Sequence, residues 1–197
     1  MSDFVIGITG ASGSIYGVRL VEELVRQKHA VDVVITPAGK IVIQEELGTS
    51  FAAYISGIGL QTIKKYVRIW ENDDFSAPFM SGSNSPKAVV IIPCSVGKLA
   101  AIANGISGNL LERMADVAIK ERRQLILVVR ETPLSLIHLE NMVKVAKAGA
   151  QILPAMPAFY HHPASIDDMV NFVAGKVLNS MGIKHGLLKG WRKKNSG

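Results

Sequence analysis

The clearest structural signal in this 197-residue chain is Phe4-Val-Ile-Gly-Ile-Thr-Gly-Ala-Ser-Gly-Ser-Ile-Tyr-Gly17. Residues 4–8 form a short apolar run rich in β-branched side chains, which is typical of a buried strand. A turn of small residues follows, and from Tyr16 to Val25 the apolar residues recur with the spacing of a helix. The stretch therefore predicts a strand, a glycine turn and a helix in that order.

The glycine turn has the properties of an anion site. The start of a helix offers free backbone N–H groups and the positive end of the helix dipole. Gly10 and Gly13 would let a phosphate approach the backbone closely, and Ser12 adds a hydroxyl donor. The glycine spacing matches neither the dinucleotide fingerprint nor the P-loop. A tight turn that needs only small residues therefore remains the alternative to the cradle of a nucleotide-like cofactor.

Composition predicts one α/β domain over residues 1–197, with a core of ordinary size. Charged residues make up only 19% of the chain, which favours an oligomer that buries further surface. No apolar run approaches membrane-spanning length, and the first residues do not resemble a signal peptide. The single Cys94 cannot form an internal disulfide, so a reducing cytoplasm is the expected location. No cluster of Cys and His has zinc-site spacing, so we expect no metal.

The formal net charge of +6 is concentrated near the C-terminus. A basic tail is expected from about residue 183 to 197, and it holds Lys184, Lys189, Arg192, Lys193 and Lys194. No basic surface motif with interleaved aromatic residues appears elsewhere. We therefore interpret the tail as solvated and expect no nucleic-acid partner.

Apolar runs alternate with helical patterns along the rest of the chain. Further strands are expected at 30–35, 88–93, 124–129 and 150–153, with helices at 37–47, from about 99, at 109–122, 136–147 and 166–181. Residues 63–70 weakly predict another strand, 48–59 have no clear assignment, and 71–86 form a long loop. This alternation predicts a doubly wound, mostly parallel sheet in three layers, Rossmann-like or flavodoxin-like.

Ligands of such folds bind outside the carboxyl ends of the strands. The polar residues expected at that edge are Ser12, Thr36, Ser95, the Arg130-Glu131 pair and the loop around Tyr160. The second strand ends in Thr36 without a carboxylate for ribose hydroxyls, which argues against NAD. Five separate stretches thus converge on one edge, and this convergence predicts a cofactor site there. Cys94 lies at the same edge and is interpreted as a buried structural thiol.

Other polar residues are open to two interpretations. Arg113, Asp116 and Lys120 share one helix face, which fits either an ion-paired solvated surface or a cationic wall for a second phosphate. Lys176 flanks the apolar stripe of the last helix and can turn toward a cleft or toward water.

Two pairs of neighbouring polar residues are also candidates for the site. Either Glu45 or Glu46 could point inward, although two solvated side chains are favoured. The adjacent His161 and His162 suggest a metal or a base, but neighbouring residues rarely ligate one ion well.

With these residues in place, the sequence closely resembles the UbiX-type flavin prenyltransferases, which are related to the Pad-type proteins. The stretches that carry the resemblance are Thr9-Gly-Ala-Ser-Gly13, Pro93-Cys-Ser-Val-Gly97, Ala118-Ile-Lys-Glu-Arg-Arg123, Arg130-Glu-Thr-Pro-Leu-Ser-Leu-Ile-His-Leu139 and Pro154-Ala-Met-Pro-Ala-Phe-Tyr-His161. The longer stretches are far more specific than a glycine pattern.

The resemblance implies a metal-independent transfer of a dimethylallyl group from dimethylallyl phosphate to N5 and C6 of reduced FMN. It also implies that the product, prenylated FMN, serves a UbiD-type decarboxylase. By the same resemblance the protein forms a homododecamer whose sites are shared between subunits. The alternatives are a flavin-dependent decarboxylase of the same fold and a non-catalytic FMN carrier.

The resemblance also assigns roles to individual residues. The residues implied in binding FMN and its phosphate are Gly10, Ala11, Ser12, Thr36, Ser95, Val96, Gly97, Lys98 and Arg130. Tyr160 and Lys176 match positions that bind dimethylallyl phosphate. The residues that match the lining of the active site are Arg113, Lys120, Glu46, Glu131 and Trp191. Among these, Ser12, Glu46, Lys120 and Glu131 are the catalytic candidates, and we hypothesise that Glu131 moves protons through Ser12.

Overall fold

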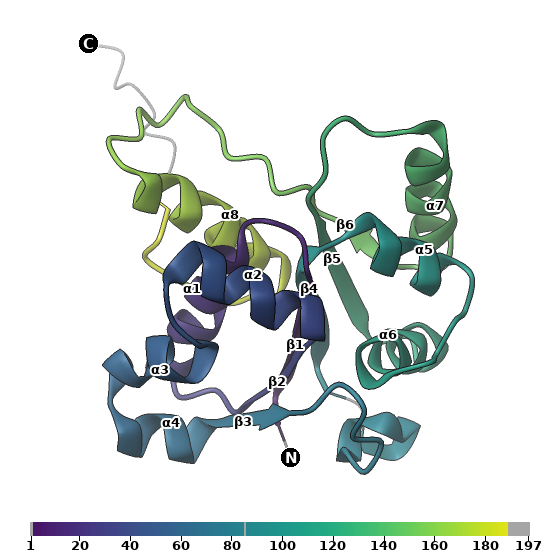
Figure 1. Ribbon diagram of the computed structural model, residues 1–197, viewed down its shortest axis with the longest axis horizontal. Coiled ribbons are helices and arrows are strands. Elements are labelled where there is room, and N and C mark those ends of the chain that lie inside the picture. The colour runs from purple at the N-terminus through teal and green to yellow at the C-terminus, as the bar shows by residue number, and fades with distance from the viewer. Residues whose placement is uncertain (1, 85, 189–197) are drawn as a thin grey trace.

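The computed structural model describes residues 2–84 and 86–188, which contain one six-stranded sheet (Figure 1). The strands are β1 (Phe4–Ile8), β2 (Val31–Ile35), β3 (Val67–Trp70), β4 (Ala88–Cys94), β5 (Gln124–Val129) and β6 (Gln151–Ile152). All neighbouring strands are parallel, and their order is β3-β2-β1-β4-β5-β6. This is the strand order of Rossmann folds, so the predicted doubly wound α/β class is confirmed.

Helices cover both faces of the sheet and complete the three layers. The helices are α1 (Ser14–Arg26), α2 (Pro37–Leu47), α3 (Phe51–Ile55), α4 (Leu60–Tyr66), α5 (Val96–Ala103), α6 (Leu110–Lys120), α7 (Leu136–Lys147) and α8 (Ile166–Ser180). Helices α1 and α8 pack together on one side, and α5, α6 and α7 lie on the other (Figure 1). None of the described helices is long and apolar enough to cross a membrane.

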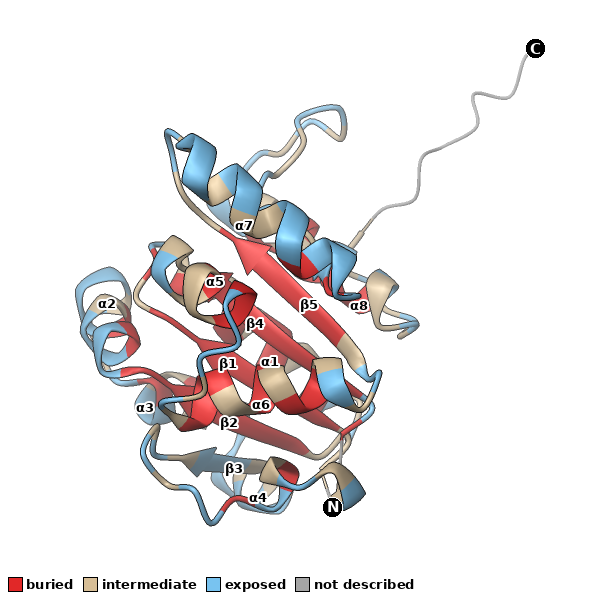
Figure 2. Ribbon diagram, turned by 90° about the vertical axis from the view of Figure 1, so that its right-hand side faces the viewer, coloured by how far each residue is buried: buried red, intermediate tan, exposed pale blue. Residues whose placement is uncertain are grey.

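The central strands supply both cores, because their side chains alternate between the two faces. Val5 and Ile91 pack among the helices α5–α7, whereas Ile6 and Val90 pack among α1, α3 and α8. Strands β1, β2 and β4 are buried along their full length, as Figure 2 shows in red. Continuous burial is what a parallel sheet covered on both faces requires, and it explains the unbroken apolar runs in the sequence.

Several predicted elements differ from those observed. Residues 63–70 are not one strand, because only Val67–Trp70 are extended and Leu60–Tyr66 form α4. The partly buried Ile63 and Tyr66 are three residues apart and pack against the same core, which is helical spacing. The helix predicted from about residue 99 begins at Val96, directly after β4, and the last strand is only Gln151–Ile152. Residues 51–58, which had no assignment, form α3 and a 3₁₀ turn.

Gly17 allows α1 to lie directly on β4. A Cβ atom at this position would lie 2.4 Å from the Ile92 carbonyl oxygen, which is a rigid backbone atom. Gly17→Ala is therefore expected to destabilise the protein by about 2 kcal/mol, although alanine favours a helix by about 1 kcal/mol. Urea unfolding measures the change. Gly57→Ala is the matched control, because its Cβ would meet no atom within 4 Å; a Gly17→Ala protein as stable as the wild type would contradict the packing argument.

Candidate functional site

The loops after the parallel strands meet at one edge, here called the carboxyl rim. The Thr36 amide donates a hydrogen bond to the Ile8 carbonyl at 3.0 Å, which ties the start of α2 to the end of β1. The Ser95 amide donates to the Thr9 hydroxyl at 2.9 Å and ties the start of α5 to the same turn. The rim is therefore one connected surface, as the positions of these residues in the sequence predicted.

Glu46 occupies the anion site that the sequence predicted for a phosphate. Its carboxylate accepts hydrogen bonds from the Gly13 amide at 2.9 and 3.1 Å, and from the Ser14 amide at 2.8 Å and hydroxyl at 2.7 Å. Solvated side chains were favoured for Glu45 and Glu46 from the sequence; Glu46 does remain exposed, but its carboxylate points to the first turn and is bound there. The start of α1 does bind an anion, but in this structure the anion is a carboxylate delivered by α2.

These contacts set the charge state of Glu46. Burial alone would raise the pKa of its carboxyl group, but hydrogen bonds from Ser12, Ser14 and the Gly13 amide outweigh burial and lower the pKa. The carboxylate is therefore firmly ionised near neutral pH. The Ser12 hydroxyl donates to this carboxylate, so Ser12 is held by the same side chain as Gly13 and Ser14.

The packing and backbone shape of the first turn require glycine at two positions. A Cβ at Gly10 would lie 2.6 Å from the Ala38 Cβ atom, so a side chain there would push α2 away from the turn. Gly13 has a φ of 97°, in the left-handed region that favours glycine. Gly10 thus allows the close approach of α2, and Gly13 gives the turn the shape in which its amide reaches Glu46.

The start of α5 is a second place at the rim where an anion could bind. Ser95 is the N-cap of α5, but its side chain makes no capping hydrogen bond. A Cβ at Gly97 would meet no atom within 4 Å, so the backbone there faces open space. By contrast, the Thr36 hydroxyl of α2 already accepts from the Gly39 amide at 3.0 Å. The predicted FMN residues at Ser95–Gly97 therefore fit a phosphate better than the first turn does.

Lys98 belongs to the same helix but is held by an ion pair. Its Nζ lies 2.6 Å from Glu112 Oε1, and the Glu112 carboxylate also accepts from the Gly108 amide at 2.9 Å. The Glu112 side chain is only 6% exposed, so burial would raise its pKa; the hydrogen bonds from Lys98 and Asn109 outweigh burial and lower it. The Lys98–Glu112 pair fastens α5 to α6, so Lys98 has a structural partner within its own chain.

Arg130 and Glu131 follow β5 at the rim. The Arg130 amide donates to the Cys94 carbonyl at 3.1 Å, and its half-buried side chain lies close enough to Tyr16 to affect that phenol. Burial raises the pKa of Tyr16, the Arg130 charge opposes this, and Glu46 adds to it. Tyr16 therefore lies among the rim charges, although the sequence did not mark it. Glu131 Oε1 accepts from the Thr132 amide at 3.0 Å.

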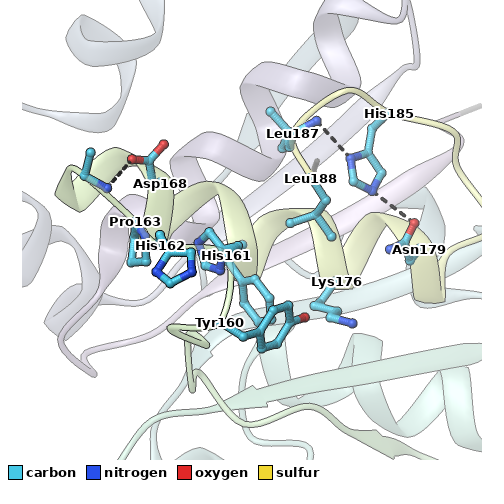
Figure 3. A pocket seen from close by; sticks show the side chains of 12 residues that line it. Tyr160, His161, His162, Pro163, Asp168, Lys176, Asn179, His185, Leu187 and Leu188 are labelled. Carbon is cyan, nitrogen blue, oxygen red and sulfur yellow. Dashed lines mark hydrogen bonds between the residues drawn. The ribbon is translucent and has the colours of Figure 1, made fainter. Parts of the chain in front are cut away.

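Tyr160 and Lys176 line one cavity of about 540 Å³ (Figure 3). The chain leaves β6, crosses the sheet on the rim side and reaches α8, which carries Lys176 (Figure 1). Both side chains flank Phe172: the Tyr160 ring lies edge-on at 5.9 Å, and Lys176 Nζ lies 5.5 Å from the ring centroid. The structure thus brings the two predicted dimethylallyl phosphate residues together, and Lys176 turns toward a cleft.

His161 and His162 also line this cavity. The His161 ring stacks on Phe172 at 5.2 Å, and neither of its nitrogens has a hydrogen-bond partner. Within residues 2–84 and 86–188 no group of three or more His, Cys, Asp or Glu side chains could hold a metal ion.

Arg113 and Lys120 lie near opposite ends of α6. Lys120, the last residue of the helix, is near the start of β5, at the edge of the sheet opposite the rim, so it is not brought to the rim of its own chain. Arg113 is three residues from Leu110, whose amide donates to the carbonyl of Asn72, two residues after β3. Arg113 Nη1 pairs with Asp116 Oδ2 at 3.0 Å, and Lys120 Nζ pairs with Glu121 Oε1 at 3.4 Å. Within one chain the ion-paired surface is therefore the observed arrangement. Trp191 lies outside the described residues.

Cys94 is fully buried at the end of β4, where burial raises the pKa of its thiol to about 12. A thiol with this pKa is almost entirely protonated at pH 8 and is a poor nucleophile. The native protein is therefore expected to react with Ellman's reagent at least about a hundredfold more slowly than the unfolded chain, which exposes one thiol. Absorbance at 412 nm with and without denaturant measures both rates; fast modification of the native protein would contradict the structural interpretation.

Comparisons with known proteins show the family of this chain. The sequence model of the Flavoprotein family matches residues 2–178. The chain is 50% identical to the flavin prenyltransferase UbiX of Alkalihalophilus pseudofirmus over 188 residues, which cover 94% of each chain. The chain belongs to the UbiX family of flavin prenyltransferases.

Solved structures of UbiX-type proteins have the same fold. A complex of AnUbiX (PadA1) with FMN and dimethylallyl pyrophosphate is 35% identical, with a TM-score of 0.87 and 96% of each chain covered. A dodecameric FMN-dependent UbiX-like decarboxylase from Escherichia coli O157:H7 is 36% identical, also with a TM-score of 0.87, over 96% of this chain and 98% of that one.

Proposed function

We propose that this UbiX-family protein transfers a dimethylallyl group from dimethylallyl phosphate to N5 and C6 of reduced FMN, and so makes prenylated FMN. The observation that carries the proposal is the 50% identity to a flavin prenyltransferase over nearly the whole of both chains. The cavity that combines Tyr160 with Lys176 supports it, because an ammonium and a phenol suit a small phosphate ester.

Lys176 and Tyr160 would hold the phosphate that leaves. Breaking the carbon–oxygen bond of an allylic phosphate puts negative charge on the departing phosphate oxygens. A positioned ammonium and hydroxyl stabilise that charge without a metal. Phe172 lies between the two groups and offers an apolar, aromatic surface to the allylic part.

The rim would bind FMN. Val96 and Gly97 would offer backbone amides of α5 to the flavin phosphate, and Ser95, whose own amide donates to Thr9, would offer its hydroxyl; Thr36 and Arg130 lie at the same rim. Reduced FMN supplies the electron-rich ring that accepts the prenyl group. Glu46 fixes the turn that presents Ser12, and Glu131 takes or returns a proton through the Ser12 hydroxyl.

The assembly would complete the site. Lys120 lies at the edge of the sheet opposite the rim, so it can serve as a phosphate ligand only where another chain presents it, and the proposed assembly is a homododecamer whose shared sites use Arg113 and Lys120. We further propose that the protein works in the cytoplasm and supplies its product to a UbiD-type decarboxylase. That enzyme class would use prenylated FMN as its cofactor.

Anaerobic incubation with reduced FMN tests the proposal. The protein is mixed with either dimethylallyl phosphate or the diphosphate, and the flavin is extracted and weighed by mass spectrometry. An increase by one C₅H₈ unit with either donor is the expected result. A flavin carrier or a decarboxylase would leave the flavin mass unchanged with both donors, and that outcome would contradict the prenyltransferase proposal.

A further inference from the structure

The residues just after α8 fold back onto that helix. The helix ends with Gly182 in the left-handed region at φ 72°, and the Ile183 amide donates to the Leu178 carbonyl at 2.9 Å. Leu187 and Leu188 then pack against the hydrophobic core. The basic tail predicted from about residue 183 thus starts, in its described part, as a packed segment. We call residues 182–188 the return segment.

His185 fastens the return segment with both of its ring nitrogens (Figure 3). The Leu187 amide donates to His185 Nδ1 at 3.1 Å, so Nδ1 carries no proton. The proton of the neutral ring is then on Nε2, which donates to Asn179 Oδ1 at 3.0 Å. One imidazole therefore joins the segment to itself and to the last turn of α8.

Gly175 provides the surface on which the segment lies. A Cβ at this position of α8 would lie 2.7 Å from Leu188 Cγ and 2.8 Å from His185 Cε1. Both contacts are far shorter than real Cβ contacts, so any side chain here must displace His185 and Leu188. The segment and the helix are thus fitted to each other at a single bare position.

The return segment is also a wall of the cavity that holds Tyr160 and Lys176. His185, Leu187 and Leu188 line this cavity together with those two residues (Figure 3). The ammonium and hydroxyl suit an anionic head, while the two leucines supply apolar surface for a short hydrocarbon chain. A prenyl phosphate has this division into a charged head and an apolar tail.

We infer that His185 is a positioning residue of the prenyl phosphate site: by holding the return segment on α8 it places Leu187 and Leu188 as the apolar wall beside Lys176. This inference rests on the proposed function. His185 touches neither the phosphate nor the flavin in this role, and it acts through the two leucines. Its loss should therefore weaken the binding of the prenyl donor and leave the chemical step in place.

The test compares His185→Ala, His185→Asn and Gly175→Ala with the wild-type full chain. We measure kcat and KM for dimethylallyl phosphate, the Kd for FMN, the Tm, and hydrogen exchange of the peptide that contains the Leu187 amide. His185→Ala and Gly175→Ala are each expected to raise KM about tenfold, with kcat within about twofold of wild type, because loss of one hydrogen bond and of the packing that it holds has this size. Exchange of the peptide should become faster in both, and the FMN Kd should not change.

His185→Asn is the rescue variant, because its amide oxygen can accept from the Leu187 amide where Nδ1 did. It should bring KM to within about threefold of wild type, again on the scale of one hydrogen bond. Lys184→Ala is the matched control, since that side chain is exposed and lies outside the cavity lining. Gly175→Ala keeps the test valid if His185→Ala folds poorly, because the added Cβ meets side-chain atoms of the return segment, which can move away, and not backbone atoms as at Gly17.

Each outcome decides one claim. If the wild type leaves the flavin mass unchanged, the proposed function fails and this inference fails with it. If the wild type prenylates flavin but the KM of His185→Ala and Gly175→Ala equals that of Lys184→Ala, only the positioning role is overturned. Unchanged hydrogen exchange in His185→Ala, or a fall in kcat without a rise in KM, would also overturn it.

Discussion

Glu46→Ala is expected to lower kcat/KM for flavin prenylation by about a hundredfold or more. The carboxylate receives hydrogen bonds from the Gly13 amide and from the amide and hydroxyl of Ser14, and each such bond to a charged group contributes about 1.5–3 kcal/mol. Loss of about 2.7 kcal/mol in the transition state corresponds to a hundredfold. Without the carboxylate the left-handed turn loses its anchor to α2, and Ser12 loses its orientation. Steady-state rates of flavin prenylation measure the effect.

Two further variants separate position from charge at this site. Glu45→Ala removes the neighbouring exposed carboxylate and should retain wild-type activity, since the recorded contacts with the turn are those of Glu46. Glu46→Gln keeps the shape but turns an NH₂ group toward N–H donors, so its activity should fall between those of wild type and Glu46→Ala. Near wild-type activity of Glu46→Ala would contradict the assignment of this residue to the site.

The lowered pKa of Glu46 gives the pH dependence of its contribution to stability. The Glu46 carboxyl binds its proton less tightly in the folded state than in the unfolded chain, where its pKa is near 4.5. Its stabilising effect is therefore fully present above about pH 4.5 and disappears as the pH falls through the lower folded value. The difference in Tm between wild type and Glu46→Gln should accordingly be largest near pH 7 and shrink below pH 4. Thermal unfolding across this range measures it; a difference that grows on acidification would contradict the sign.

Single helices, strands and turns of this fold could be predicted from the sequence, because each is determined by residues that are adjacent in the chain. The first strand, its glycine turn and the helix after it follow from adjacent residues, and Ser135 caps a helix whose predicted range of 136–147 is the observed one. The contact of Glu46 with the first turn could not be predicted from adjacent residues. Its partners lie 32 and 33 residues away, and the close packing of Ala38 on Gly10 is a contact between distant residues that no local pattern reports.

Long-range pairing also explains the other differences at the site. Lys98 was assigned to FMN by the resemblance, but the buried carboxylate that holds it comes from another helix, fourteen positions along the chain. The return segment was interpreted as part of a solvated basic tail, because positive charge is concentrated near the C-terminus, yet the bare Gly175 of α8 allows it to pack. A glycine inside an amphipathic helix was the available sign of close packing.

Lys176→Ala should reduce kcat/KM for dimethylallyl phosphate by about two to three orders of magnitude, since removing one positioned donor to a developing oxyanion has this cost. The Lys176 ammonium lies over Phe172 and lines the cavity with Tyr160, so its loss takes the positive charge from the place where the phosphate would leave. FMN binding should be unchanged, because the rim loops and not α8 are proposed to hold the flavin. Lys176→Arg retains the charge and should recover most of the rate, although its planar group directs its hydrogen bonds differently.

Lys184→Ala is the matched control, because this exposed lysine lies eight positions further along the chain and outside the cavity lining. It should behave as wild type in rate and in FMN affinity. The comparison separates an enzyme from a carrier, since a protein that only delivers FMN would not need Lys176. Equal rates of flavin prenylation for Lys176→Ala and Lys184→Ala would therefore remove the phosphate site from this cavity, even if the flavin product were still formed.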